Sequence, residues 1–388
     1  MSTIKVQNIQ HTGSSTNAIA LASDGTCTAN LSNRQGKNLI INGAMNVAQR
    51  LGGGVATTSQ GYQTVDRFQV GYSGADENLT QMQGSVSSGT TPYTLGFRNT
   101  LKITNGNQTS GAGASDYVYI DMALEGQDVA GSGWNYNSAS SFITFSFWIK
   151  SSVAQSFKGY FITEDGTNYS YAFDTGSLSA DTWTKVTKTI SGNSNLTINN
   201  DTGRAFSFSI WPFIGTGLTD SSVTENAWIT HSGSARTKDA TSTWWTTNDA
   251  TFEITGVQLE VSDHATDFEH RSYAQELQLC KRYCQVIGES GKFIGHPAYY
   301  RGSTIEIQVA FHPELRANPT FSATSGSDYY YFYRESGFDE FDAWTDIGSM
   351  GTKGGAVYSN HSSVSVTTTG KAGGLYTLHG KLTFSAEL

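Results

Sequence analysis

Apolar and polar side chains alternate along several segments of this chain, and this pattern constrains its fold more than any other feature. The segment SFITFSFWIK places Ile143, Phe145, Phe147 and Ile149 on one face. The segments DYVYIDMALE (116–125) and AFSFSIW (205–211) follow the same period of two. Such alternation is typical of half-buried antiparallel strands.

Turn and bulge signals separate these segments. Asp165-Gly166 is a dipeptide that favours a tight hairpin turn. In TFEITGVQLEV the alternation changes phase at Gly256, which predicts a β-bulge. Strands at this spacing predict an all-β fold of antiparallel β-sandwich or jelly-roll domains, joined by one short helix and preceded by an extended N-terminal arm.

Composition excludes several other classes of protein. Only 15% of residues are charged, and the aromatic share of 12% argues against intrinsic disorder. The net charge is −9 and no run of Lys or Arg is present, so no nucleic-acid partner is expected. No apolar stretch approaches the roughly 20 residues of a membrane span, so no membrane insertion is expected. The three cysteines cannot form a disulfide framework.

Four parts follow one another along the chain. Residues 1–36 contain too few apolar side chains to form a core, and they are predicted to be an attachment arm that lies on a partner. Residues 37–270 are predicted to form the β-sandwich, 271–289 a short helix, and 290–388 a C-terminal β-domain.

The predicted helix begins at a capping box. Ser272 is its expected N-cap, with Gln275 three residues later. A 4-3-4-3 spacing of apolar residues indicates a narrow seam, formed by Tyr273, Leu277, Cys280, Cys284 and Ile287. Two interpretations remain open: the helix packs on the sheets of its own chain, or the seam lies on a symmetry axis between copies.

Three segments resemble one known group of proteins. They are NLIINGAMNVAQR (38–50), VDRFQV (65–70) and GVQLEVSDHATDFEHRSYAQELQLCKRY (256–283). Together with the opening MSTIKVQNIQHTGSSTNAIALASDGT, they are similar to tailed-bacteriophage virion proteins of the tail-fibre-like group, as found in marine phages. Where that group has a Tyr pair near the helix end, this chain has Tyr283-Cys284. The middle of the chain resembles carbohydrate-binding modules of jelly-roll type in its strand pattern.

The resemblance implies a structural, homotrimeric component on the exterior of a virion. It implies that residues 1–36 contact other virion proteins of the tail or baseplate. It does not distinguish a tail fibre from a head fibre or a capsid decoration protein.

Motifs of catalysis and metal binding are lacking. The sequence has no HExxH, GxSxG, P-loop or paired CxxC. We therefore expect no enzyme activity, no cofactor and no metal site, with a polysaccharide depolymerase as the alternative. Cys280 and Cys284 are interpreted as small apolar side chains of a core.

Two tryptophans lie on the polar faces of their predicted strands. Trp148 is opposite Phe145 and Phe147, and Trp211 is opposite Phe208 and Ile210. A tryptophan in this position either stacks on a ligand such as a sugar ring or is covered by another segment or subunit. Both interpretations remain open.

An aromatic and acidic stretch, SDYYYFYRESGFDEFDAWTDIG (327–348), is the most unusual part of the C-terminal region. One interpretation is a recognition loop that contacts host surface glycan; the other is a long hairpin with a solvated acidic tip. Its candidate contact residues are Tyr329, Tyr331, Tyr333, Phe338, Asp339, Glu340, Phe341, Asp342 and Trp344. The acids could also hold calcium, although their spacing is not that of an EF-hand loop.

Overall fold

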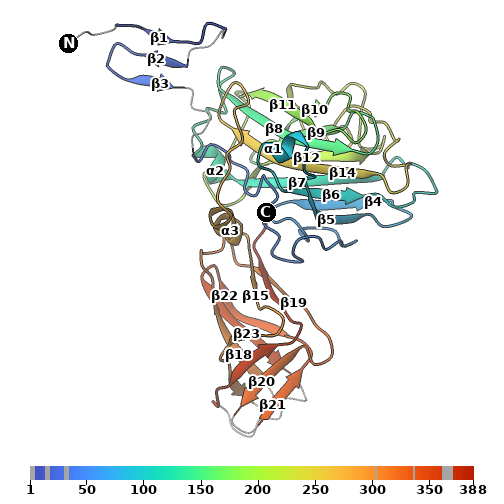
Figure 1. The fold of residues 1–388 in the computed structure, drawn as a ribbon, viewed down its shortest axis with the longest axis vertical. Coiled ribbons are helices and arrows are strands. Elements are labelled where there is room, and N and C mark those ends of the chain that lie inside the picture. Colours follow the sequence, from blue (N-terminus) through green and yellow to red (C-terminus); the bar gives the residue numbers. More distant parts are fainter. Residues whose placement is uncertain (1–4, 14–17, 30–34, 302–303, 335–336, 361–369) are drawn as a thin grey trace.

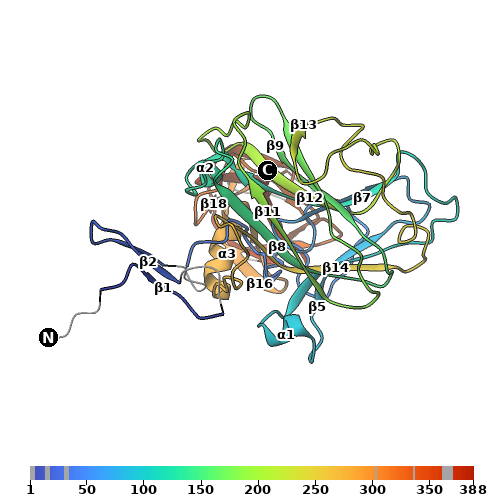
Figure 2. The same ribbon diagram turned by 90° about the horizontal axis from the view of Figure 1, so that it is seen from above.

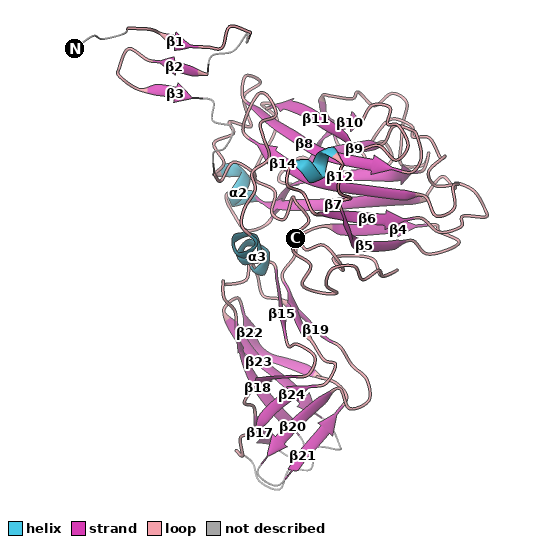
Figure 3. Ribbon diagram, in the orientation of Figure 1, coloured by secondary structure: helices cyan, strands magenta, loops and turns pink. Residues whose placement is uncertain are grey.

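The computed structural model describes residues 5–13, 18–29, 35–301, 304–334, 337–360 and 370–388. Figure 1 shows an N-terminal arm at one end of the long axis, a large β-sandwich beside it, and a smaller β-domain at the other end. Strands dominate all three parts (Figure 3). The predicted all-β fold with one short linking helix is confirmed. No helix in the described residues is long and apolar enough to cross a membrane.

The arm is a small antiparallel sheet of three strands, β1 (Asn8–Ile9), β2 (Ile19–Leu21) and β3 (Cys27–Ala29). It projects away from the sandwich (Figure 2). Val6, Ile9 and Leu21 are more than 40% exposed. Where burial is described, no arm residue is buried, so these strands have no core of their own.

Two facing sheets form the sandwich. The six-stranded sheet has the order β13-β10-β9-β12-β7-β4 and comprises β4 (Gln69–Ser73), β7 (Tyr117–Glu125), β9 (Lys158–Thr163), β10 (Tyr169–Asp174), β12 (Arg204–Ile214) and β13 (Trp228–Thr230). The five-stranded sheet has the order β11-β8-β14-β6-β5 and comprises β5 (Thr80–Ser85), β6 (Asn99–Thr104), β8 (Phe142–Ser151), β11 (Thr184–Ser191) and β14 (Thr251–Glu260). Two short helices, α1 (Thr91–Thr94) and α2 (Gly126–Ala130), lie in their connections.

The alternating residues fill the space between the two sheets. Phe145 and Phe147 of β8 are fully buried, and the ring centroid of Phe145 lies 4.7 Å from that of Phe208 in β12. The hairpin expected at Asp165-Gly166 joins β9 to β10. The bulge expected at Gly256 is present: the register of β14 against β8 shifts between Thr255 and Gln258, and Gly256 has a φ of 62°.

Helix α3 (Tyr273–Lys281) connects the sandwich to the C-terminal domain. It begins at the expected capping box, in which the Ser272 side chain accepts from the Gln275 amide. The helix expected over 271–289 is too long, however, and the five-residue seam is wrong. Cys284 and Ile287 lie in strand β15 (Cys284–Ile287), which pairs with the last strand of the chain instead of continuing the helix.

The seam residues therefore do not share one face. Cys280 and Cys284 are fully buried inside their own chain, as the core interpretation predicted. Leu277 and Ile287 are half-buried, and Ile287 packs against the C-terminal core. Tyr273 alone among the five is exposed, at 59%.

The C-terminal domain consists of three small antiparallel sheets around one core. The first has the order β15-β25-β19, with β19 (Thr320–Ala323) and β25 (Leu382–Ser385). The second has the order β16-β24-β20-β21, with β16 (Lys292–Gly295), β20 (Tyr330–Arg334), β21 (Gly337–Phe341) and β24 (Gly374–Thr377). The third has the order β17-β18-β23-β22, with β17 (Ala298–Arg301), β18 (Thr304–Ala310), β22 (Asp346–Gly351) and β23 (Gly354–Asn360).

Buried ion pairs join the C-terminal domain to the sandwich. Glu387 forms ion pairs with Arg67 and with Arg50, the latter at 3.2 Å. The Arg67 guanidinium is buried, lies 3.4 Å from the ring centroid of Tyr283, and donates to the Ala123 carbonyl at 2.6 Å. Charges buried this deeply require partners. The buried charges of each domain are therefore paired only when the other domain is in place.

Candidate functional site

Five aromatic side chains gather on the outer face of the sheet β16-β24-β20-β21. We call this group the aromatic platform. It consists of Phe293 on β16, Tyr376 on β24, Tyr331 and Tyr333 on β20, and Phe338 on β21. In Figure 1, β20 and β21 lie at the end of the molecule opposite the N-terminal arm.

Strand register places these side chains together. Phe293 pairs with Tyr376, Tyr376 pairs with Tyr331, and Tyr331 pairs with Glu340. Residues directly opposite each other in antiparallel strands share a face of the sheet. Tyr333 and Phe338 form a second row beside the first. Four strands from three separate parts of the sequence thus contribute to one surface.

The platform rings contact one another mainly at an angle. The centroid of Tyr376 lies 5.4 Å from that of Phe293 and 6.2 Å from that of Tyr331. Phe338 lies 5.4 Å from both Tyr331 and Tyr333. Inclined contacts of this kind are favourable for aromatic rings because the edge of one meets the face of the other.

One glycine makes room for the platform. A Cβ on Gly374 would lie 2.8 Å from Cε1 of Phe293, so the Phe293 ring occupies the space that a side chain on β24 would take.

The platform is open to solvent. Phe293 is 59% exposed, Phe338 47% and Tyr333 38%, while Tyr331 and Tyr376 are half-buried between them. Clusters of exposed rings are unusual on soluble proteins and indicate a surface that binds something.

Hydroxyl groups lie among the apolar rings. Within the described part of the chain, the hydroxyls of Tyr331, Tyr333 and Tyr376 make no hydrogen bond. Desolvation, together with the nearby charges of Glu340 and Asp328, raises the pKa of Tyr331 above its ordinary value. The Tyr331 hydroxyl therefore stays protonated at neutral pH and can donate to a ligand.

The inner face of the same sheet belongs to the domain core. Tyr330, Phe332 and Phe341 are fully buried there, and Trp344 is 7% exposed. The Phe341 ring stacks on Tyr330 at 5.3 Å and meets Trp344 edge-on at 5.3 Å. Phe341 and Trp344 are thus core residues, and their assignment as contact residues is wrong.

Asp339 is also withdrawn from the surface. It lies on the buried face of β21, where it accepts from the Tyr299 hydroxyl and pairs with Arg334 at 2.9 Å. Burial alone would raise its pKa, but the hydrogen bonds from Arg334 and Tyr299 outweigh burial and lower it. The prediction that Asp339 contacts a ligand directly is therefore wrong, because its oxygens are already satisfied.

The remaining candidates of this stretch lie around the platform. Glu340 is half-buried on the platform face, opposite Tyr331. Asp342 accepts from the Asp328 amide at 3.0 Å. Tyr329 is half-buried, and its ring packs against His379 at 5.3 Å. No group of His, Cys, Asp and Glu in the described residues could hold a metal ion.

The two sandwich tryptophans differ in how far their own chain covers them. Trp211 is 2% exposed and packs against Tyr119 at 5.3 Å, beneath apolar residues of the segment 218–240. Trp148 is half-buried and packs against a small cluster that includes Phe97 and Phe268. Trp211 is thus covered by another segment, as one of the two interpretations predicted. Neither indole belongs to the aromatic platform.

Sequence reasoning missed two platform residues, Phe293 and Tyr376. Each lies in a four-residue strand flanked by glycine, too short for its alternation to be recognised. Their contribution depends on pairing between residues 80 to 85 positions apart, in Lys292–Gly295 and Gly374–Thr377. A single sequence carries no signal for that pairing.

Comparisons with known proteins find only distant likenesses. No family model matches the chain, and no curated protein matches it in sequence. The enzymatically active domain of tailspike protein 4 from bacteriophage CBA120 is 9% identical over 58% of this chain and 21% of that chain, with a TM-score of 0.31.

Two further solved structures are similar at the same level. A putative sugar-binding protein from Bacteroides thetaiotaomicron is 12% identical over 58% of this chain and all of that chain, with a TM-score of 0.30. The N-terminal cellulose-binding domain of Cellulomonas fimi β-1,4-glucanase C is 10% identical over 56% of this chain and all of that chain, with a TM-score of 0.27. At these scores the likenesses carry no conclusion about what this chain does.

Proposed function

We propose that this chain is a glycan-binding structural component of a phage virion, a homotrimeric tail-fibre-like protein on the exterior of the particle. Residues 1–36 attach it to other virion proteins, and the C-terminal domain contacts host surface glycan. The observation that carries the glycan-binding part is the aromatic platform. The assignment to a virion rests on the resemblance of the sequence motifs.

The chemistry of the platform suits a sugar. Pyranose rings present C–H faces that pack on aromatic rings, and hydroxyls that hydrogen-bond to polar groups. Phe293, Tyr333 and Phe338 offer exposed rings. The Tyr331 hydroxyl lies on the same face and supplies a donor. Amphipathic rings also provide contact area at a low cost in conformational entropy.

The position of the platform supports a role in host contact. The coreless arm and the platform lie at opposite ends of the long axis (Figure 1). A protein held by its arm would therefore present the platform away from the particle. Three copies acting together would increase a weak single-site affinity about 10²-fold or more where their sites can engage at once.

We propose that the chain binds glycan without cleaving it. A glycosidase needs two carboxyl groups that flank the scissile bond. Asp339 is not available for that role, because it is buried with Arg334 and Tyr299. Release of reducing sugar from a bound polysaccharide would favour the depolymerase alternative.

Binding to an array of immobilised bacterial surface polysaccharides tests the proposal. Tyr333→Ala and Phe338→Ala should each weaken binding to the best ligand about thirtyfold, since a good aromatic anchor contributes about 2 kcal/mol. Leu95→Ala is the matched control, because Leu95 is a 50% exposed apolar residue of the sandwich.

Two results would contradict the proposal. One is a wild-type protein that binds no polysaccharide on the array or on cells. The other is an equal loss of binding in the Leu95→Ala control, which would place the effect outside the platform. Immunogold labelling of purified particles would separately decide between a tail appendage, a head fibre and a capsid decoration protein.

A further inference from the structure

A narrow recess opens on the outer face of the five-stranded sheet of the sandwich, and we call it the Trp148 recess. Its volume is about 150 Å³, and four rings line it, those of Trp148 on β8 and of Phe97, Phe268 and His270 in the connections around it. A hollow of this volume holds a single six-membered ring. The recess shares no residue with the aromatic platform, which lies in the other domain.

The bulge of β14 leaves room for these rings to approach one another. A Cβ on Gly256 would lie 2.7 Å from Cζ of Phe97 and 3.1 Å from Cδ1 of Trp148, so both rings use space that only a glycine leaves free. The Phe97 ring also packs against those of Phe268 at 4.9 Å and His270 at 5.1 Å. The aromatic wall is therefore formed before any ligand enters, which favours binding because little order remains to be imposed.

A hydroxyl without a partner also lines the recess. Ser146 precedes Trp148 by two residues on β8, so both side chains lie on the outer face of the sheet. Ser146 is only 3% exposed, and within the described part of the chain its hydroxyl makes no hydrogen bond. The indole N–H of Trp148 likewise donates to none of the described residues. Because a buried polar group without a partner is costly, a ligand that hydrogen-bonds to Ser146 would be stabilised here.

Two charges of opposite sign line the same recess. Lys185 is directly opposite Trp148 in the register of β11 with β8, and Asp267 lies in the segment that follows β14. Both are exposed, and neither forms an ion pair with any residue that the structure describes. An ammonium group donates hydrogen bonds and a carboxylate accepts them. Because the two charges cancel, they favour a neutral ligand rich in hydroxyl groups over an acidic or a basic one.

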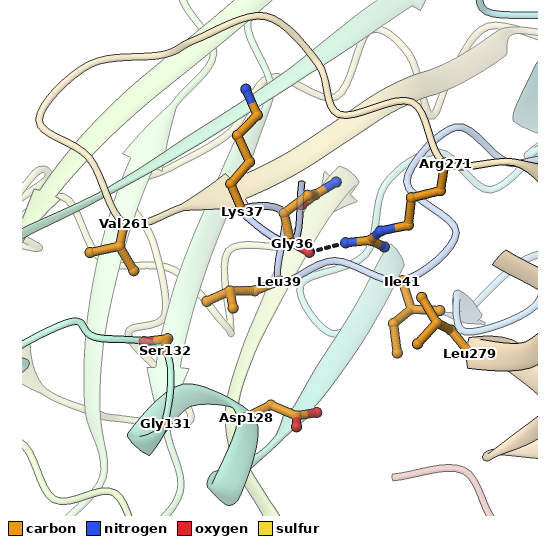
Figure 4. A pocket seen from close by; sticks show the side chains of 11 residues that line it. Gly36, Lys37, Leu39, Ile41, Asp128, Gly131, Ser132, Val261, Arg271 and Leu279 are labelled. Carbon is orange, nitrogen blue, oxygen red and sulfur yellow. Dashed lines mark hydrogen bonds between the residues drawn. The ribbon is translucent and has the colours of Figure 1, made fainter. Parts of the chain in front are cut away.

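A larger hollow beside α2 lacks such an aromatic wall. Its volume is about 400 Å³, and Leu39, Asp128 and Arg271 are among the residues that line it (Figure 4). None of the described residues around it is aromatic, and Arg271 is already paired with Glu269 at 3.5 Å. A sugar ring has no surface there on which to stack, so the Trp148 recess suits a sugar better.

We propose that the Trp148 recess binds one neutral hexopyranose residue of a glycan. The C–H face of the sugar ring packs on the Trp148 indole. Its hydroxyls meet the buried Ser146 on the inside and the exposed Lys185 and Asp267 on the outside. An aromatic wall with a few polar groups at fixed positions is typical of sites for small ligands. The site is additional to the aromatic platform and does not depend on it, since the two lie in different domains.

Saturation-transfer difference NMR with the methyl glycosides of glucose, galactose and mannose tests the site. The measurement is made on the full chain carrying Tyr333→Ala and Phe338→Ala, so that the aromatic platform does not contribute. At least one of these glycosides should bind, with the strongest transfer to protons on one face of its ring. The methyl glycosides of glucuronic acid and glucosamine should bind more weakly, because each carries a charge.

Variants of the recess identify where the sugar binds. In the same background, Trp148→Ala should weaken binding about thirtyfold, because it removes the aromatic anchor. Lys185→Met and Ser146→Ala should each weaken it about fivefold, because each removes one hydrogen bond. Lys102→Met is the matched control, since Lys102 lies on β6 of the same sheet and does not line the recess. The exposed position of Lys185 keeps the test valid if Trp148→Ala lowers the melting temperature.

Four results would overturn this site. They are no binding of any neutral glycoside, tighter binding of a charged glycoside than of every neutral one, unchanged binding in all the recess variants, and an equal loss in the Lys102→Met control. None of them bears on the aromatic platform, which is tested by the binding of polysaccharides to the wild type and to its platform variants. A failure of that test would in turn leave the Trp148 recess standing.

Discussion

Neighbouring aromatic residues of this chain have opposite roles because of the pleat of a strand. Tyr331 and Tyr333 point outward on β20, while Tyr330 and Phe332 point into the core. The same parity on β21 separates Phe338 and Glu340 from Asp339 and Phe341. The candidates predicted on β20 follow this parity, but those predicted on β21 come from both faces, although the alternation there could also be read from the sequence.

This separation predicts that two phenylalanines three residues apart respond differently to truncation. Phe341→Ala should lower the free energy of unfolding by about 3–5 kcal/mol, because it removes a fully buried ring from the core. Phe338→Ala should lower it by less than about 1 kcal/mol, since its ring is 47% exposed. Urea unfolding followed by fluorescence measures both. Equal losses would contradict the assignment of the two faces.

At the scale of elements, sequence signals were reliable where residues close together in the chain determine the local structure. The bulge at Gly256, the turn at Asp165-Gly166 and the capping box at Ser272 depend on residues within a few positions of one another, and all three are present. The end of α3 was mispredicted because a distant strand decides it. Residues Cys284–Ile287 pair with Leu382–Ser385, and that pairing overrides a helical spacing of apolar residues.

The arm is an element whose removal should leave the rest of the molecule intact. Deleting residues 1–36 should change the melting temperature of the body little, because the described arm residues bury no side chain. The truncated protein should fail to join assembled particles when supplied during assembly. Calorimetry and immunoblotting of purified particles are the measurements, with full-length protein as the control. Normal incorporation of the truncated protein would place the attachment elsewhere.

At the scale of the whole molecule, the two domains are coupled by charge. Glu387→Gln should lower the free energy of unfolding by about 3–5 kcal/mol, because it leaves the buried Arg67 guanidinium without its counter-ion. Glu289→Gln should change it by less than about 0.5 kcal/mol, since Glu289 is exposed. Differential scanning calorimetry should also show one transition for the wild type and two for the variant. A shift as small as that of the control would mean that this ion pair does not hold the domains together.

Acid should weaken the same junction through Glu125, which binds Arg282 with two hydrogen bonds of 2.7 Å. Burial alone would raise the pKa of Glu125, but the hydrogen bonds from Arg282 and Tyr283 outweigh burial, and the pKa lies below the ordinary value of 4.5. A carboxyl group with a lowered folded-state pKa stabilises the fold above its unfolded pKa, and this stability is lost as the pH falls through the folded value. Stability should therefore decrease below about pH 4.5.

The variant Glu125→Gln isolates this contribution. It should be less stable than the wild type at pH 7 and should lose less additional stability between pH 5 and pH 3. Urea unfolding at a series of pH values gives the comparison. Parallel curves for the two proteins would show that Glu125 does not set the acid sensitivity.

The pairing of Arg67 with Glu387 also bears on how the protein is made. The two residues are 320 positions apart. The sandwich therefore leaves the ribosome well before Glu387, the counter-ion of Arg67, is synthesised. The last strand of the sandwich, β14, ends at Glu260, so at ordinary rates of translation the wait for Glu387 is roughly 6 to 25 seconds. During this time the nascent sandwich holds a cation without its partner and cannot reach its final stability. Completion of the first domain thus waits for Glu387 to be translated, which favours chaperone protection of the growing chain and proteolytic removal of chains that stop before that residue.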